Sequence, residues 1–421
     1  MNRSLQIRLF AICFLLIGKL NATDLIVSSG GAGGAYPTIN AAVSAANSGD
    51  RIIVYPISTG AAYSEGTITL TKSIQILSAN EGAYFTVDAN VNITPAAAGM
   101  SVSIMEMKLV TGSIQTVVNA PAGNRCVVNV INDSIINGGV FFDANNYNVT
   151  VANSYTGNSV YVNFGRVLGN VINTTISAAV YGIHVSTDAI ASTDSILIIG
   201  NKITVINTSP SMTGIYWGST SQYFQILNNF IYFPYPYYYG YGINVITSKN
   251  SNAGTNLIVN NTIQKLSTSY YMYYGIACAT AASAYTEIQN NLVSSPIVNY
   301  QYVYCNGGTF SVHYNLITSL AISGFTNDGT NIVLTNTTLD ANGKITTTVP
   351  ASNAINAGNP DSAFVDINLT RNDVGAYGGS FTLDNYFPNG ANDWARVFYM
   401  VAPRRVLVNG TINVRADGYD K

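Results

Sequence analysis

Charge is scarce in this sequence. Asp, Glu, Lys and Arg make up 9% of the 421 residues, and the formal net charge is −2. Because no basic patch or run is present, the composition argues against a nucleic acid partner. Hydrophobic residues make up 48% of the chain, which excludes an intrinsically disordered protein. Asn, Ser, Thr and Tyr must therefore supply most of the polar surface.

Cysteine and histidine are also few. Four cysteines do not make a disulfide scaffold, and two histidines leave little room for acid–base chemistry. The glycine-rich residues 30–34 lack the following Lys of a phosphate-binding loop, so they predict a flexible linker. We expect no cofactor and no metal site.

Long apolar runs are missing after the first residues. Arg3 and Arg8 precede the apolar stretch Leu9 to Gly18, which is followed by Lys19 to Ala22. This order predicts a secretory signal peptide over residues 1–22. The stretch is too short to span a bilayer, so we expect no membrane span in the mature chain. The protein is predicted to be secreted or held at the cell surface.

A short phrase recurs nine times between residues 131 and 340, and successive copies are 20 to 32 residues apart. Each copy has one or two apolar residues, then Asn or a stand-in, then another apolar residue. A repeat of this length without helical spacing predicts an all-β solenoid, a parallel β-helix. A β-sandwich or a membrane barrel would not require one residue type at the same point of every turn. The middle polar residues are Asp133, Asn153, Thr174, Asn201, Asn229, Asn261, Asn291, Asn315 and Thr337.

A second phrase sets five triplets in register. Strand alternation points the outer residues of each triplet inward and the middle residue outward. His184, Tyr216 and Asn244 would then form either one polar subsite or an ordinary polar column. Cys278 and Cys305 would be neighbours one coil apart, bridged by a disulfide or present as free buried thiols. The triplets are Ile183-His184-Val185, Ile215-Tyr216-Trp217, Ile243-Asn244-Val245, Ile276-Ala277-Cys278 and Val303-Tyr304-Cys305.

A short amphipathic helix precedes the coils and would cover the open end of the solenoid. Its apolar face consists of Ile39, Ala42, Val43 and Ala46. The expected domains are a signal peptide over 1–22, a linker and N-terminal cap over 23–50, the parallel β-helix over 51–380, and C-terminal strands or a cap over 381–421. The last segment would be a pair of strands that covers the last coil, or the start of a truncated appendage.

The two ends of the repeat region resemble a known group. The run from Tyr36 to Val54 resembles the amino-terminal cap of secreted right-handed parallel β-helix proteins of the pectin lyase-like superfamily. The run from Asp366 to Gly379 resembles the closing motif of bacterial members. The resemblance implies a right-handed β-helix. It implies no single function, because the superfamily includes lyases, hydrolases, adhesins and proteins without known activity.

The catalytic motifs of enzymes in that superfamily are missing. Polygalacturonases carry Asn-Thr-Asp, Asp-Asp, Gly-His-Gly and Arg-Ile-Lys motifs, because inverting hydrolysis needs two carboxyl groups, and none of these occurs here. Pectate lyases need carboxylates for calcium, whereas Glu287 is the only acidic residue from Ser195 to Asn327. The charged residues outside this region that could meet are Glu106, Lys108, Arg125, Asp133, Asp143 and Arg166, with Asp133 expected in the Asn column.

Tyrosine clusters in three successive coils, over residues 237–241, 270–274 and 300–304. Each cluster follows the middle Asn of its copy of the recurring phrase by about the same number of residues, so the clusters should stack on one side. Such a shelf can contact the apolar faces of sugar rings, or it can serve stability alone. The candidate ligand-binding residues are Tyr238, Tyr239, Tyr241, Tyr270, Tyr271, Tyr273, Tyr300, Tyr302 and Tyr304, together with His184, Tyr216 and Asn244.

Two classes of function follow. The scarcity of charge and the Tyr shelf favour a non-catalytic secreted β-helix protein that acts through its surface, as an adhesin-like or glycan-binding protein. Its partner would be a neutral glycan or a cell-surface polysaccharide. The alternative is a polysaccharide lyase or glycoside hydrolase, which the superfamily resemblance alone supports. We identify no catalytic residue.

Overall fold

The computed structural model describes residues 22–421 except 81, 176–179, 207–211, 235–239, 269–270, 297, 348–351, 388–395, 402–413 and 420–421. The predicted signal peptide therefore lies, apart from Ala22, outside the described residues. Within the described part of the chain, no helix is long and apolar enough to cross a bilayer.

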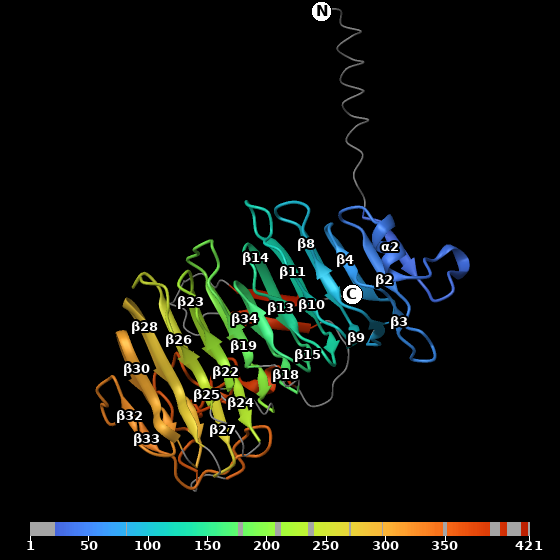
Figure 1. The fold of residues 1–421 in the computed structure, drawn as a ribbon. Helices are drawn as coiled ribbons and strands as arrows, with labels where there is room; N and C mark the ends of the chain where they lie inside the picture. The colour runs from blue at the N-terminus through green and yellow to red at the C-terminus, as the bar shows by residue number, and fades with distance from the viewer. Residues whose placement is uncertain are drawn as a thin grey trace, which may run out of the picture.

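The chain winds into coils of three short strands, and each strand pairs in parallel with its equivalent in the next coil. A 21-stranded sheet supplies two faces of the coils and a 12-stranded sheet supplies the third. The coils follow one another in a row, from α2 (Ile39–Ala45) at one end to β33 (Ile332–Val333) at the other (Figure 1). The predicted parallel β-helix is confirmed.

The three faces are named here A, B and C in the order in which a coil visits them. Face A contains β1 (Asp24–Val27), β2 (Arg51–Val54), β5 (Ile74–Ser78), β8 (Ser101–Met105), β11 (Cys126–Ile131), β14 (Tyr147–Ala152), β17 (Gly165–Leu168), β20 (Ser195–Ile199), β23 (Tyr223–Leu227) and β26 (Thr255–Val259). Face B contains β3 (Tyr63–Ser64), β6 (Phe85–Asp88), β9 (Met107–Thr111), β12 (Ser134–Ile135), β15 (Tyr155–Thr156), β18 (Val171–Asn173), β21 (Lys202–Thr204), β24 (Phe230–Phe233), β27 (Thr262–Lys265), β29 (Leu292–Ser294), β31 (Leu316–Ile317) and β33.

Face C contains β4 (Ile68–Leu70), β7 (Val91–Ile93), β10 (Ile114–Gln115), β13 (Val140–Phe142), β16 (Val160–Val162), β19 (Tyr181–Val185), β22 (Met212–Trp217), β25 (Gly240–Val245) and β32 (Ile322–Ser323). Two longer strands, β28 (Met272–Gln289) and β30 (Val298–His313), start on face C and end on face A, so they join the two faces into one sheet. Inward-pointing Val, Ile, Leu and Phe side chains fill the space between the faces and form one continuous core.

The turn from face A to face B holds a row of buried asparagines, called here the amide row. The side-chain amide of each residue donates to the Oδ1 of the next at 2.8 to 3.0 Å, and its second N–H donates to a backbone carbonyl of the preceding coil. Each donor is satisfied, so the row carries no desolvation penalty. Its members are Asn170, Asn201, Asn229, Asn261, Asn291, Asn315 and Asn331.

Three of the middle polar residues predicted for this buried row lie outside it. Ser154 and Asn170 hold the places expected for Asn153 and Thr174, and Asn331 holds that of Thr337. The residue before every row member except Asn331 turns the backbone through the left-handed region, and Asn153, before Ser154, does the same with a φ of 52°. Asn and Gly adopt this conformation most readily, so two adjacent turn residues can both be Asn, and the phrase does not say which one is buried. Asp133 begins the row as predicted, since its backbone N–H donates to Ser154 Oγ.

The N-terminal helix covers the first coil as predicted. Residues 39, 42, 43 and 46 are buried, and Thr38 caps the helix by accepting a hydrogen bond from the Ala41 N–H at 3.1 Å. Strand β1 lies within the expected linker and pairs in parallel with β2. The glycine-rich residues form the short 3₁₀ helix η1 (Ala32–Gly34).

Among the described residues, those after 380 lie against the middle coils instead of covering the last one. Residues 352–387, which include η2 (Leu383–Asn385), return along the turns between faces A and B, and the side-chain amides of Asn228 and Asn260 donate to the carbonyls of Ala376 and Gly375. The hairpin of β34 (Arg396–Val401) and β35 (Arg415–Tyr419) then lies against the middle coils (Figure 1). The predicted pair of strands is therefore present, but it does not cover the last coil. Side chains at the turns hold the segment before it, and strand periodicity does not reveal such contacts.

Candidate functional site

The outward residues of face C form a straight row. Backbone pairing aligns Tyr161 with His184, His184 with Tyr216, and Tyr216 with Asn244. The same row continues through Ala277 to Tyr304. The predicted alignment of His184, Tyr216 and Asn244 is therefore confirmed, and so is the inward direction of their flanking residues, which are all buried.

A column of glycines adds a second outward row. Gly182 and Ile183 are both buried, so Tyr181 on one side and His184 on the other both face outward. A Cβ on Gly182 would lie 2.4 Å from Ile203 Cγ2 in the core, so only glycine fits here. The column is Gly182, Gly214, Gly242 and Gly275, and the second row is Tyr181, Thr213, Tyr241, Tyr274 and Gln301.

Two aromatic clusters result, which together we call the aromatic strip. In the first, the His184 ring stacks on Tyr181 at 4.7 Å and lies 4.6 Å from Tyr161 and 5.0 Å from Tyr216. Phe141 extends this cluster by an edge contact with Tyr161 at 5.3 Å. The strands that carry these residues, β13, β16, β19 and β22, are neighbours on face C.

The second cluster is built around Tyr274. Its ring stacks on Tyr241 at 5.7 Å and on Tyr300 at 5.3 Å, and it lies 5.3 Å from Tyr304. Tyr273 stacks on Tyr300 at 5.8 Å and lies 5.9 Å from Tyr271. Tyr300 is 51% exposed, which leaves much of its ring open to solvent. Thr213 and Asn244 lie between the two clusters in the backbone register.

The strip is uncharged near neutral pH. Burial lowers the pKa of His184, and a smaller opposing effect of Asp143 does not reverse this. Burial also raises the pKa of Tyr161, Tyr241 and Tyr274, so their phenols stay protonated. The Nδ1 atom of His184 is buried without a hydrogen-bond partner. The strip therefore offers ring faces and neutral hydroxyls to a ligand.

The predicted shelf is only partly recovered. Tyr238, Tyr239 and Tyr270 lie outside the described residues. Tyr302 is buried instead of exposed, and its hydroxyl donates to the Ser295 carbonyl at 2.8 Å. In this coil Tyr302 follows Gln301 and so takes the place held by glycine in the four preceding coils, which turns its side chain inward.

Tyr161, Tyr181 and Tyr274 were not among the predicted ligand-binding residues. A signal for two of them exists in the sequence, since Tyr181-Gly-Ile, Tyr241-Gly-Ile and Tyr274-Gly-Ile repeat one phrase. The predicted triplets begin at the Ile of this phrase. Strand alternation within a triplet does not give the direction of a residue that precedes an inserted glycine.

Cys278 and Cys305 are backbone partners on β28 and β30, as expected. Both thiols are free in this structure, and burial raises the pKa of Cys305 to about 12. The predicted choice between free thiols and a bridge remains a prediction for the protein in solution.

Of the charged residues outside the central coils, Glu106 lies near the buried Asp133 and raises its pKa. The two arginines pair with other carboxylates. Arg125 forms an ion pair with the buried Asp188 at 2.7 Å, and Arg166 pairs with Asp417. Among the described residues, no group of three or more His, Cys, Asp or Glu side chains is placed to hold a metal ion.

Fold and surface together define a parallel β-helix with an aromatic outer face. No family model matches the chain, and no curated protein matches it. Among solved structures, the crystal structure of pectate lyase Pel9A is similar at 16% sequence identity with a TM-score of 0.43, over 85% of this chain and 96% of that one.

Proposed function

We propose that this chain is a non-catalytic β-helix protein that binds a neutral glycan on the aromatic strip of face C. The observation that carries the proposal is the arrangement around Tyr274, whose ring lies among those of Tyr241, Tyr300 and Tyr304 at 5.3 to 5.7 Å. Tyrosine rings of this kind offer large rigid contact areas at low entropic cost.

The spacing of the coils supports a polymeric ligand. Equivalent strands are about 4.8 Å apart, which is close to the length of one pyranose unit in an extended chain. A glycan that lies along the solenoid axis can therefore present one ring to each coil. Seven neighbouring strands carry the strip, from β13 to β30.

The charge of the strip supports a neutral ligand. Its members are Phe, Tyr and His, and burial lowers the pKa of His184, so no cation is present to pair with a uronate carboxylate. The alternative, a lyase or hydrolase acting on an acidic polysaccharide, needs carboxylates and a base near the substrate. Arg125 and Arg166 are instead paired with carboxylates of this chain.

We also propose that the protein works outside the cytoplasm, at the cell surface or free in the medium. The support is the order of Arg3, Arg8 and the apolar stretch from Leu9 to Gly18 in the sequence. A glycan-binding surface suits that location.

The test is binding of neutral and acidic polysaccharides by the full mature chain. We expect binding to a neutral β-glucan or galactomannan, and about tenfold weaker binding for Tyr300→Ala and for Tyr304→Ala. Tyr55→Ala is the matched control, because Tyr55 is 46% exposed but lies outside the strip.

Equal binding by all three variants would show that the strip is a structural feature. Release of an ultraviolet-absorbing unsaturated product from polygalacturonate would instead support the lyase. Circular dichroism of each variant establishes that the fold is retained.

A further inference from the structure

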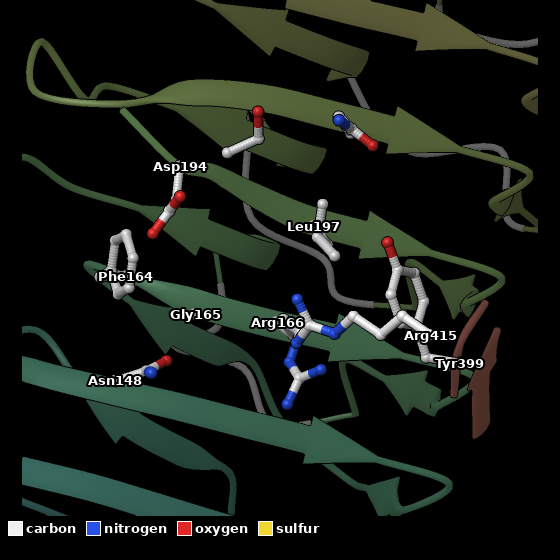
Figure 2. Close-up of a pocket in the computed structure, with 10 residues that line it drawn as sticks. Asn148, Phe164, Gly165, Arg166, Asp194, Leu197, Tyr399 and Arg415 are labelled. Carbon is white, nitrogen blue, oxygen red and sulfur yellow. The ribbon is translucent and has the colours of Figure 1, made fainter. Parts of the chain in front are cut away.

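The C-terminal hairpin and face A enclose a pocket of about 280 Å³ that is separate from the aromatic strip. Figure 2 shows Phe164 and Asp194 at one end of this pocket and Tyr399 and Arg415 at the other.

Specific contacts hold the hairpin over the pocket. Arg166 of β17 pairs with Asp417 of β35, and the same carboxylate oxygen accepts from Arg415 at 3.2 Å. Tyr399 of β34 stacks on Phe381 with ring centres 6.1 Å apart. The wall that the hairpin contributes is therefore fixed by an ion-pair network and a ring contact.

The charges around the pocket balance. The guanidinium groups of Arg166 and Arg415 are offset by the carboxylates of Asp417, which bonds to both, and Asp194 at the opposite end. Two guanidinium groups and two carboxylates leave no net charge around the pocket, so the charge of a charged ligand would itself lack compensation in this partly enclosed site. The charge balance therefore favours a neutral ligand.

The polar groups suit a ligand with adjacent hydroxyls. The amides of Asn148 and Gln225 each present a donor and an acceptor on neighbouring atoms, and the guanidinium groups present neighbouring donors only. Such planar groups can bond to two neighbouring hydroxyls at once, because each hydroxyl both donates and accepts. Phe164, Leu197 and Tyr399 offer apolar surface to the C–H side of a ring.

We infer that this pocket binds a single neutral sugar ring, either a free monosaccharide or the end of a glycan chain. Its volume of about 280 Å³ lies just below the range of about 300 to 1,000 Å³ that is typical of small-molecule sites, which suits one ring inside the pocket. The site does not depend on the aromatic strip, since it lies on face A and the strip lies on face C.

The experiment is a ligand-observed nuclear magnetic resonance titration of the full mature chain with the methyl glycosides of glucose, galactose and mannose. We expect binding of at least one of them, and about tenfold weaker binding by Gln225→Ala. Gln75→Ala is the matched control, because Gln75 lies in the same outward row of face A, well away from the pocket.

Further arms separate the alternatives. Short oligosaccharides of the same sugar should compete well if the ligand is a chain end and only weakly if the ligand is a free sugar. Tyr300→Ala should leave this titration unchanged, so failure of the strip proposal and failure of this one are distinguishable. Absence of binding by all three glycosides, tighter binding of glucuronate than of glucose, or equal binding by Gln225→Ala and Gln75→Ala overturns the inference.

Discussion

The side-chain amide of Asn229 donates to Oδ1 of Asn261 at 3.0 Å, and both side chains are completely buried. The backbone N–H of Asn229 donates to the same oxygen at 3.0 Å. One side chain therefore satisfies two donors of the preceding coil, which explains why the same residue type recurs along the sequence.

Replacement of Asn261 by Ala should strongly destabilise the fold. The change removes the acceptor of both Asn229 donors and leaves the Ile226 carbonyl without its partner. At about 1 to 3 kcal/mol for each unsatisfied buried group, we expect a loss of roughly 3 kcal/mol or more in the free energy of unfolding, measured in urea. Asn252→Ala, at an exposed position, should change it by less than about 0.5 kcal/mol. Equal effects of the two changes would contradict this account.

Replacement of Asp133 by Asn should stabilise the protein at neutral pH. Burial raises the pKa of Asp133 well above its usual value, and Glu106 raises it further. The folded state thus keeps a proton that the unfolded state releases above about pH 4. Stability is therefore lost as pH rises from about 4 toward the raised pKa of Asp133 in the folded state. Asn keeps the oxygen that accepts from the Met107 N–H and fits the amide row.

The measurement for Asp133→Asn is urea unfolding at pH 4.5 and at pH 7.5. We expect the variant to gain more than about 1 kcal/mol over the parent at the higher pH and less at the lower one, since each unit of pKa shift is worth about 1.4 kcal/mol. Asp143→Asn, at an exposed site, is the control. A gain that is the same at both pH values would contradict the proton account.

Replacement of Gly242 by Ala should disrupt face C. The new Cβ would lie 2.5 Å from the Gly275 carbonyl oxygen and 2.7 Å from Ile263 side-chain carbons. Because one contact is to backbone, relief requires the coils to shift, and we expect a cost of about 1 to 3 kcal/mol or more in thermal or urea unfolding. Gly66→Ala meets nothing within 4 Å and should be neutral or slightly stabilising. A tolerated Gly242→Ala would argue against the glycine column.

The buried thiols should be unreactive in the folded protein. Burial raises the pKa of Cys126, Cys278 and Cys305, so little thiolate is present at pH 8. We expect a thiol reagent to label the native mature chain slowly and to label all three residues quickly in urea. A single labelled cysteine after unfolding without reductant would instead reveal a Cys278–Cys305 disulfide, and fast labelling before unfolding would contradict the burial.

Much of the architecture could be predicted from spacing. The recurring phrase predicted stacked coils, and the triplets around His184 and Tyr216 predicted which residues pair across strands, because a parallel register repeats one environment at each coil. The phrase did not distinguish Asn153 from Ser154, since both fit a left-handed turn followed by a buried polar residue. Tyr302 was misplaced because its inward direction depends on the glycine column of the neighbouring coils.

By itself, the sequence determined the coil, its buried polar row and the uncharged character of its surface. These properties follow from the local pattern of apolar and polar residues, from side-chain chemistry and from a sequence phrase that recurs in successive coils. Only the tertiary structure decided that Tyr161, Tyr181 and His184 meet in one cluster, and that Asp417 reaches Arg166 across 251 positions of the chain. Such contacts arise where an inserted glycine turns a side chain outward or where a distant segment folds back onto the coils, and strand alternation alone predicts neither.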